Sequence, residues 1–109
     1  MLLEYTGDVR PSMSVKIVIL KSMEDVIADV KEMVSSDKTI GYVLVNPYVV
    51  SLSSDGSQVG FYPYAPLSKD TSVPIPCDWV VSVLEPKDEI LNSYMERINA
   101  KPENSNSEE

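Results

Sequence analysis

Two apolar segments in the second half of the chain each contain two prolines, and this limits the possible folds more than any other feature. Pro63 and Pro66 interrupt the segment 58–67, and a second pair of prolines opens the segment 73–85. Proline has no backbone N–H, so within a sheet it is confined to edge strands, strand starts and bulges. Both segments are otherwise rich in β-branched and aromatic residues, which is typical of strands. We therefore expect them to be the two edge strands of an antiparallel sheet.

Three further segments have the composition of β-strands. The segment 15–20 is a β-branched run. The segment 25–34 alternates apolar and charged side chains, which favours a half-solvated strand, although its Glu, Lys, Ala and Met residues also suit a helix. The segment 39–52 is apolar on both faces near its middle, as in a central strand. Within it, Asn46-Pro47 predicts a sharp bend.

The remaining segments predict one helix between two irregular ends. Residues 1–14 show no periodicity and are expected to form an irregular arm. Pro86 suits the first turn of a helix over 86–100, because the N–H groups of that turn have no intrahelical partner. One apolar stripe along this helix consists of Ile90, Leu91, Tyr94, Met95 and Ile98. The polar tail 101–109 is expected to be disordered.

Together these elements predict a mainly β domain over residues 15–100, with a five-stranded, strongly bent antiparallel sheet or small open barrel and a C-terminal α-helix. Its edge strands would be long and apolar, which makes them prone to pair with another chain. Edge pairing with a second copy is heterologous and closes a ring if the rotation permits. A monomer whose edges are covered by the helix is the alternative. The side chains expected at a subunit interface are Val59, Phe61, Tyr62, Tyr64, Ile75, Trp79 and Val81.

The composition bears on function mainly through what the chain lacks. Its 109 residues include no histidine and one cysteine, so the usual general base, metal-ligand clusters and an internal disulfide are absent. No phosphate-binding loop or nucleophile motif is present either. We expect no enzyme activity, no cofactor and no metal site.

The formal net charge of −8 counts against strong, non-specific binding of nucleic acid. No apolar run is long enough to span a membrane, and the cysteine usage favours a cytoplasmic location.

Several stretches resemble those of Sm-like proteins of the LSm and Hfq type. "VKIVILKSMEDVIADVKEM" resembles the first two strands of that family, and "VPIPCDWVVSVLEP" resembles its last strand. More narrowly, "EDVIADVKEM", "IGYVLVNPYVV" and "APLSKDTSVPIPCDWVV" are similar to small Sm-like proteins of cyanophages and ocean metagenomes. The resemblance covers residues 15–85. Two glycines of the family pattern are replaced, by Met23 and Ala28, and the helix follows the strands instead of preceding them.

This resemblance implies a homo-oligomeric ring of about five to seven subunits that binds RNA or single-stranded DNA. It also implies a role in nucleic-acid processing or regulation during phage infection, in the cytoplasm of a bacterial host. The residues that would contact nucleic acid are Ser36, Asp37, Lys38, Ser68 and Lys69. The alternative interpretation of these residues is two ordinary hairpin turns. A ring-forming interaction or assembly module without nucleic-acid binding is the alternative function.

Overall fold

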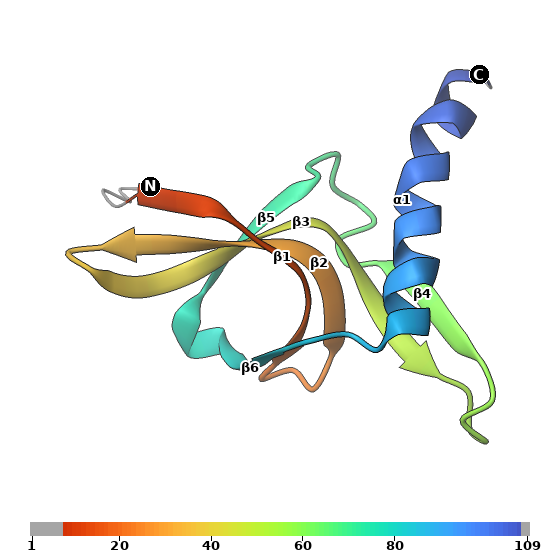
Figure 1. Ribbon diagram of the computed structural model, residues 1–109, viewed down its shortest axis with the longest axis horizontal. Coiled ribbons are helices and arrows are strands. Elements are labelled where there is room, and N and C mark those ends of the chain that lie inside the picture. The colour runs from red at the N-terminus through yellow and green to blue at the C-terminus, as the bar shows by residue number, and fades with distance from the viewer. Residues whose placement is uncertain (1–7, 108–109) are drawn as a thin grey trace.

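The computed structural model describes residues 8–107, which form one bent antiparallel sheet and one C-terminal helix (Figure 1). The strands are β1 (Asp8–Leu20), β2 (Asp25–Ser35), β3 (Lys38–Leu52), β4 (Val59–Pro63), β5 (Ser72–Pro76) and β6 (Val80–Leu84). A short 3₁₀ helix, η1 (Cys77–Trp79), joins β5 to β6, and α1 (Asp88–Ser107) follows. The sheet order is β4-β3-β2-β1-β6, and β5 also pairs with β3. The predicted mainly β fold is confirmed, with a sheet that is open and not closed into a barrel.

Strand β3 bends at Asn46-Pro47, as the sequence predicts. Asn46 has a positive φ of 53°, a conformation that asparagine adopts more readily than most residues. Two residues of β3, Asn46 and Pro47, lie opposite the single residue Ala28 of β2, where regular pairing has one opposite one. This β-bulge turns the strand and reverses the face on which the following side chains lie.

The bulge divides the buried side chains between two cores on opposite faces of the sheet. In a regular strand Leu44 and Tyr48 would share a face, yet they lie in different cores. The first core is built by strands and consists of Val18, Leu20, Val26, Ala28, Val30, Leu44 and Ile75. The second core lies between the sheet and α1 and consists of Ile27, Tyr48 and Tyr94. The alternation of Ala28 and Ile27 between the two cores confirms that 25–34 is a strand and not a helix.

Helix α1 packs against the second core through the predicted apolar stripe. The stripe members around its buried Tyr94 are Ile90, Met95 and Ile98. The Tyr94 hydroxyl donates towards the carbonyl oxygens of Val45 and Asn46, at 3.2 Å and 3.0 Å, beside the bulge where the strand ladder is disrupted. Burial raises the pKa of Tyr94 to about 12, so the hydroxyl stays a neutral donor at physiological pH. The helix is thereby tied to the point where β3 bends.

The N-terminal end of the sheet extends further than the sequence indicates. Strand β1 begins at Asp8, within the predicted irregular arm 1–14, because Asp8 pairs with Val34 near the end of β2. A long hairpin partner can keep a segment extended even when its own sequence has no alternating pattern. Residues 1–7, the rest of that arm, lie outside the described residues.

The C-terminal helix is also longer than predicted. It begins at Asp88 instead of Pro86 and continues to Ser107, over most of the tail 101–109 for which we expected disorder. Once a helix has formed, each further residue adds a hydrogen bond while fixing only its own backbone, so a packed helix extends readily. Residues 108 and 109 lie outside the described residues.

The two proline-containing segments differ most from the prediction. The predicted strand 58–67 is a strand only as far as Pro63, and residues 64–71 form a loop. The predicted strand 73–85 is two strands, β5 and β6, separated by η1. The two physical reasons differ. β4 pairs with β3 only after the bend, so it ends where the bulge begins. The segment 73–85 passes from one end of the sheet to the other, because β5 pairs with β3 and β6 pairs with β1, and η1 lies between them.

Candidate functional site

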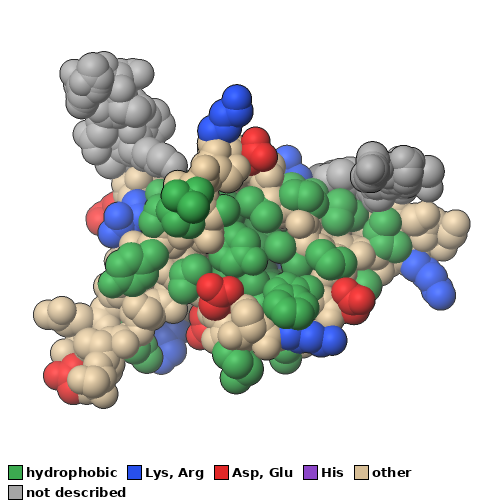
Figure 2. All heavy atoms as spheres, turned by 180° about the vertical axis from the view of Figure 1, so that it is seen from behind, with side chains coloured by type: hydrophobic (Ala, Val, Ile, Leu, Met, Phe, Trp, Pro, Cys, Tyr) green, Lys and Arg blue, Asp and Glu red, His purple; other side chains and the backbone are tan. Residues whose placement is uncertain are grey.

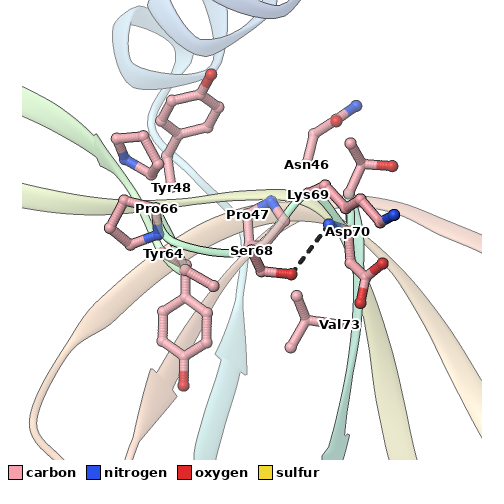
Figure 3. A pocket seen from close by; sticks show the side chains of 12 residues that line it. Asn46, Pro47, Tyr48, Tyr64, Pro66, Ser68, Lys69, Asp70 and Val73 are labelled. Atoms are coloured by element: carbon pink, nitrogen blue, oxygen red, sulfur yellow. Dashed lines mark hydrogen bonds between the residues drawn. The ribbon is translucent and has the colours of Figure 1, made fainter.

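A pocket of about 250 Å³ lies where β3 bends, at the edge of the sheet (Figure 3). Residues 46–48 of β3 form one wall, and residues from the segment 63–73 form the other. The pocket exists because β4 and β5 leave a gap between them along β3. The loop 64–71 crosses this gap and shapes the opening.

Backbone hydrogen bonds hold both ends of this loop to the bend. The Tyr64 N–H donates to the Pro47 carbonyl oxygen at 3.1 Å, and the Asn46 N–H donates to the Thr71 carbonyl oxygen at 2.7 Å. Inside the loop, the Asp70 N–H donates to the Ser68 hydroxyl at 3.0 Å (Figure 3). The pocket therefore has walls whose backbone is fixed at several points.

The pocket is apolar on one side and polar on the other. In Figure 3, the rings of Tyr64 and Pro66 lie on one side, and Lys69 and Asp70 lie on the other. Burial, with a smaller contribution from Glu24, raises the pKa of the Tyr64 hydroxyl, so this group is a neutral hydrogen-bond partner at neutral pH and not a base. Such a lining suits the binding of one flat, partly polar group.

Residues 8–107 lack two features that would indicate other functions. They contain no group of three or more His, Cys, Asp or Glu side chains that could hold a metal ion. In the same part of the chain, no helix combines the length with the apolar character needed to cross a membrane.

The structure does not bring the two predicted nucleic-acid loops together. Ser36, Asp37 and Lys38 are exposed at the turn between β2 and β3, which projects at the left of Figure 1. Ser68 and Lys69 line the pocket instead, on the loop that lies towards α1 in Figure 1. The segments nearest the β2–β3 turn are the start of β1, where Asp8 pairs with Val34, and the end of β5, where Pro76 pairs with Gly41.

The predicted interface residues fall into two groups. Those with exposed side chains are Val59 and Tyr62 of β4, Trp79 of η1 and Val81 of β6. The other three pack within the subunit. Phe61 is half-buried in the second core, with the Arg97 guanidinium 5.4 Å from its ring centroid. Tyr64 packs against the first core and Ile75 is buried in it. The side chain of Ile75 is therefore not available to a neighbouring subunit, which corrects that assignment.

Sequence reasoning missed two surface features. Leu84 of β6 is exposed, and Leu67 is fully exposed at the loop beside the pocket. Figure 2 shows that hydrophobic side chains also gather over the middle of the rear face, with charged side chains around them. No local signal marks the early end of the predicted fourth strand: Pro63 and Pro66 also suit an edge strand, and Pro74 and Pro76 do lie within the paired strand β5.

Comparison with known proteins places the chain in a family without assigning an activity. A family model described as a family of unknown function (DUF6561) matches residues 13–99. No curated protein matches the chain. Neither result bears on the resemblance to Sm-like proteins, which stays a prediction. With most of its length matched by that model, the chain belongs to this family of unknown function.

Proposed function

We propose that this protein is a non-catalytic assembly protein whose copies pair edge to edge, β4 of one against β6 of the next, into a closed Sm-like ring. The observation that carries the proposal is the open sheet, in which β4 and β6 are terminal strands. Uncovered strand edges are templates for pairing with another chain. Unlike edges that pair head to tail form a heterologous contact, which closes a ring when the rotation permits. The Sm-like resemblance favours about five to seven subunits.

Backbone hydrogen-bonding groups support β4 as one of the two contacts. The Tyr64 N–H points to β3, where it donates to Pro47. Because successive residues of a strand present these groups to opposite sides, Val59 and Phe61 present theirs to the outer edge. That edge therefore keeps two N–H donors for a neighbour.

Strand β5 is a poor alternative to β4. Pro74 and Pro76 are paired with β3 but have no N–H to donate. The Thr71 carbonyl faces β3, where it accepts from Asn46. Pro74 and Pro76 lie three and five positions later, so both face the outer side of β5, which lacks those two donors. The five residues of β6, in contrast, include no proline. Its neighbourhood also exposes the apolar side chains of Trp79, Val81 and Leu84, which suits a buried contact.

A charge placed on the proposed contact tests it. Light scattering should show that the wild-type protein is an oligomer at tens of micromolar, and that Val81→Lys shifts it towards the monomer. Leu52→Lys is the matched control, because Leu52 is also exposed but lies on β3, between β2 and β4. A wild-type protein that is monomeric at this concentration would overturn the proposal, as would equal effects of both variants.

Binding of RNA or single-stranded DNA by the assembled ring is a second candidate function. It is favoured by the exposed ring of Tyr62 and by Lys69 on the loop that follows, because stacking on aromatic rings and phosphate contacts are how single strands are bound. The net charge of −8 means that such binding would depend on local groups repeated around the ring. A cytoplasmic location in a bacterial host and a role in phage infection belong to this candidate.

The nucleic-acid candidate is tested with fluorescent oligo(U), oligo(A) and mixed-sequence single-stranded DNA at low salt. We expect binding at micromolar protein that weakens steeply with salt, because phosphate contacts release counterions. Lys69→Ala should weaken binding more than Lys87→Ala, which removes an exposed lysine before α1. If none of the three probes binds, the nucleic-acid part of the proposal is wrong and the assembly part stands.

A further inference from the structure

The pocket at the β3 bend has the size of a site for one side chain. Sites for small-molecule ligands and cofactors usually measure roughly 300–1,000 Å³, and this pocket measures about 250 Å³. It also lies at the edge of the sheet, directly after β4. An occupant that arrives along that edge would be a side chain of the chain that pairs with it.

Trp79 has the properties of such an occupant. It is the only tryptophan of the protein, and 41% of its surface is exposed. It immediately precedes β6, because η1 ends at Trp79 and β6 begins at Val80. Tryptophan is enriched among the residues that carry most of the binding energy of interfaces, where it fills a pocket of the partner.

The outward-facing residues of the two strands place Trp79 opposite the pocket. β4 and β6 have five residues each. In β6 the backbone groups of Leu84 face β1, since Leu84 pairs with Ile17, and those of Val83 face outward. Antiparallel pairing that sets Val83 of the neighbouring copy opposite the outward-facing Val59 or Phe61 places its Trp79 opposite Pro63 or Ala65, on either side of Tyr64. Tyr64, Pro63 and Ala65 all line the pocket.

We propose that Trp79 of one copy inserts into the pocket at the β3 bend of the next copy. This inference rests on the proposed assembly and identifies its anchor. Pro63 and Tyr64 offer apolar walls for the indole ring. The indole N–H is a donor only and needs an acceptor when buried, and the Ser68 hydroxyl and Asp70 carboxylate on the polar side of the pocket can accept.

Intrinsic fluorescence tests this contact without a label, because Trp79 is the only tryptophan. At concentrations where light scattering shows the oligomer, we expect emission at shorter wavelength and weak quenching by acrylamide. Dilution to the monomer should move the emission to longer wavelength and increase the quenching. An oligomer whose Trp79 remains fully accessible to acrylamide would overturn the pocket proposal and leave the assembly intact. A protein that stays monomeric would overturn the assembly itself.

A variant that fills the pocket provides the second measurement. Ser68→Tyr adds a ring at an exposed position of the pocket wall and should weaken association about tenfold or more, the loss expected for a blocked anchor. Ser54→Tyr makes the same change on the exposed loop between β3 and β4, away from the pocket, and should associate like the wild type. Equal association of the two variants would contradict the insertion of Trp79. The wild-type fluorescence decides the question if Ser68→Tyr does not fold.

Discussion

Strands β4 and β5 pair with successive halves of the same edge of β3, but different parts of the molecule hold them in place. β5 is fixed by the sheet: Ile75 is buried in the first core, and β5 approaches β3 so closely that a Cβ on Gly41 would lie 2.5 Å from the Ile75 carbonyl oxygen. β4 has no such anchor in the first core. Its Phe61 lies in the second core, near Arg97 of α1. One half of β3 therefore has a partner held by strands, and the other half has a partner held by the helix.

Removing the helix contact should separate the two halves most strongly. We expect Tyr94→Ala to lower the free energy of unfolding by about 3–5 kcal/mol, the usual cost of truncating a buried aromatic side chain. Tyr94 is fully buried in the second core and its hydroxyl contacts the β3 bend. Urea denaturation measures the loss, and hydrogen exchange should show that the amides of β4 lose more protection than those of β5.

Tyr94→Phe is the control for this variant. It keeps the ring and removes only the hydroxyl that donates to Val45 and Asn46, so it should cost about 0.5–1.5 kcal/mol. If Tyr94→Ala costs no more than Tyr94→Phe, the helix does not hold the second half of the sheet.

The difference between β4 and β5 also shows which features the sequence could predict. Local signals were sufficient for the bend, because Asn46-Pro47 combines a residue that tolerates positive φ with one that cannot donate to a ladder. They were also sufficient for the buried face of α1, where Tyr94 lies at the centre of the predicted stripe. The period-two pattern of β2 correctly favoured a strand.

What the sequence could not predict depends on the bulge in β3. Where β4 ends and where β5 begins are set by the register of β3 before and after Pro47, and nothing in the segment 58–67 alone reports that register. The same long-range cause hides the pocket, because its two walls are 46–48 and residues from 63–73. Ser68 and Lys69 therefore line a pocket that no local pattern in the sequence indicates.

The next largest expected effect concerns the outer edges of β4 and β5, and it depends on the proposed assembly. A change at the outer edge of β4 should alter subunit association, and a change at the outer edge of β5 should not. Val59→Pro removes one outward N–H from β4 and leaves the groups that face β3 intact. The loss of one hydrogen bond is worth about 0.5–1.5 kcal/mol, so each subunit contact should weaken up to about tenfold. Sedimentation or light scattering across a dilution series measures this change.

The matching change on β5 works in the opposite direction. Pro76→Ala adds an N–H to the outer side of β5, at an exposed position, and should leave association unchanged because that edge is not the proposed contact. If Pro76→Ala alters association as much as Val59→Pro does, β5 and not β4 meets the neighbouring copy.

The smallest expected effect concerns the loop that connects β3 to β4, for which β5 has no counterpart. Asp55 accepts hydrogen bonds from the Ser57 N–H at 3.0 Å and from the hydroxyls of Ser57 and Ser53 at 2.7 and 2.8 Å. The Ser57 backbone N–H is the main cause that lowers the pKa of Asp55 to about 2. The folded pKa of Asp55 lies below its unfolded value. As the pH falls from about 4 to about 2, the unfolded chain therefore binds more protons than the folded protein does, and stability is lost over that window.

Urea titrations at different pH values test this effect. Asp55→Asn should lack this part of the acid dependence. Asp70→Asn, which removes one charge on the 64–71 loop, should retain it. Since the Asp55 loop is exposed, the difference in stability between Asp55→Asn and the wild type should be small and confined to acid pH. If the free energies of unfolding of Asp55→Asn and the wild type differ more near neutral pH than in acid, the Asp55 carboxylate instead stabilises the conformation of the β3–β4 hairpin.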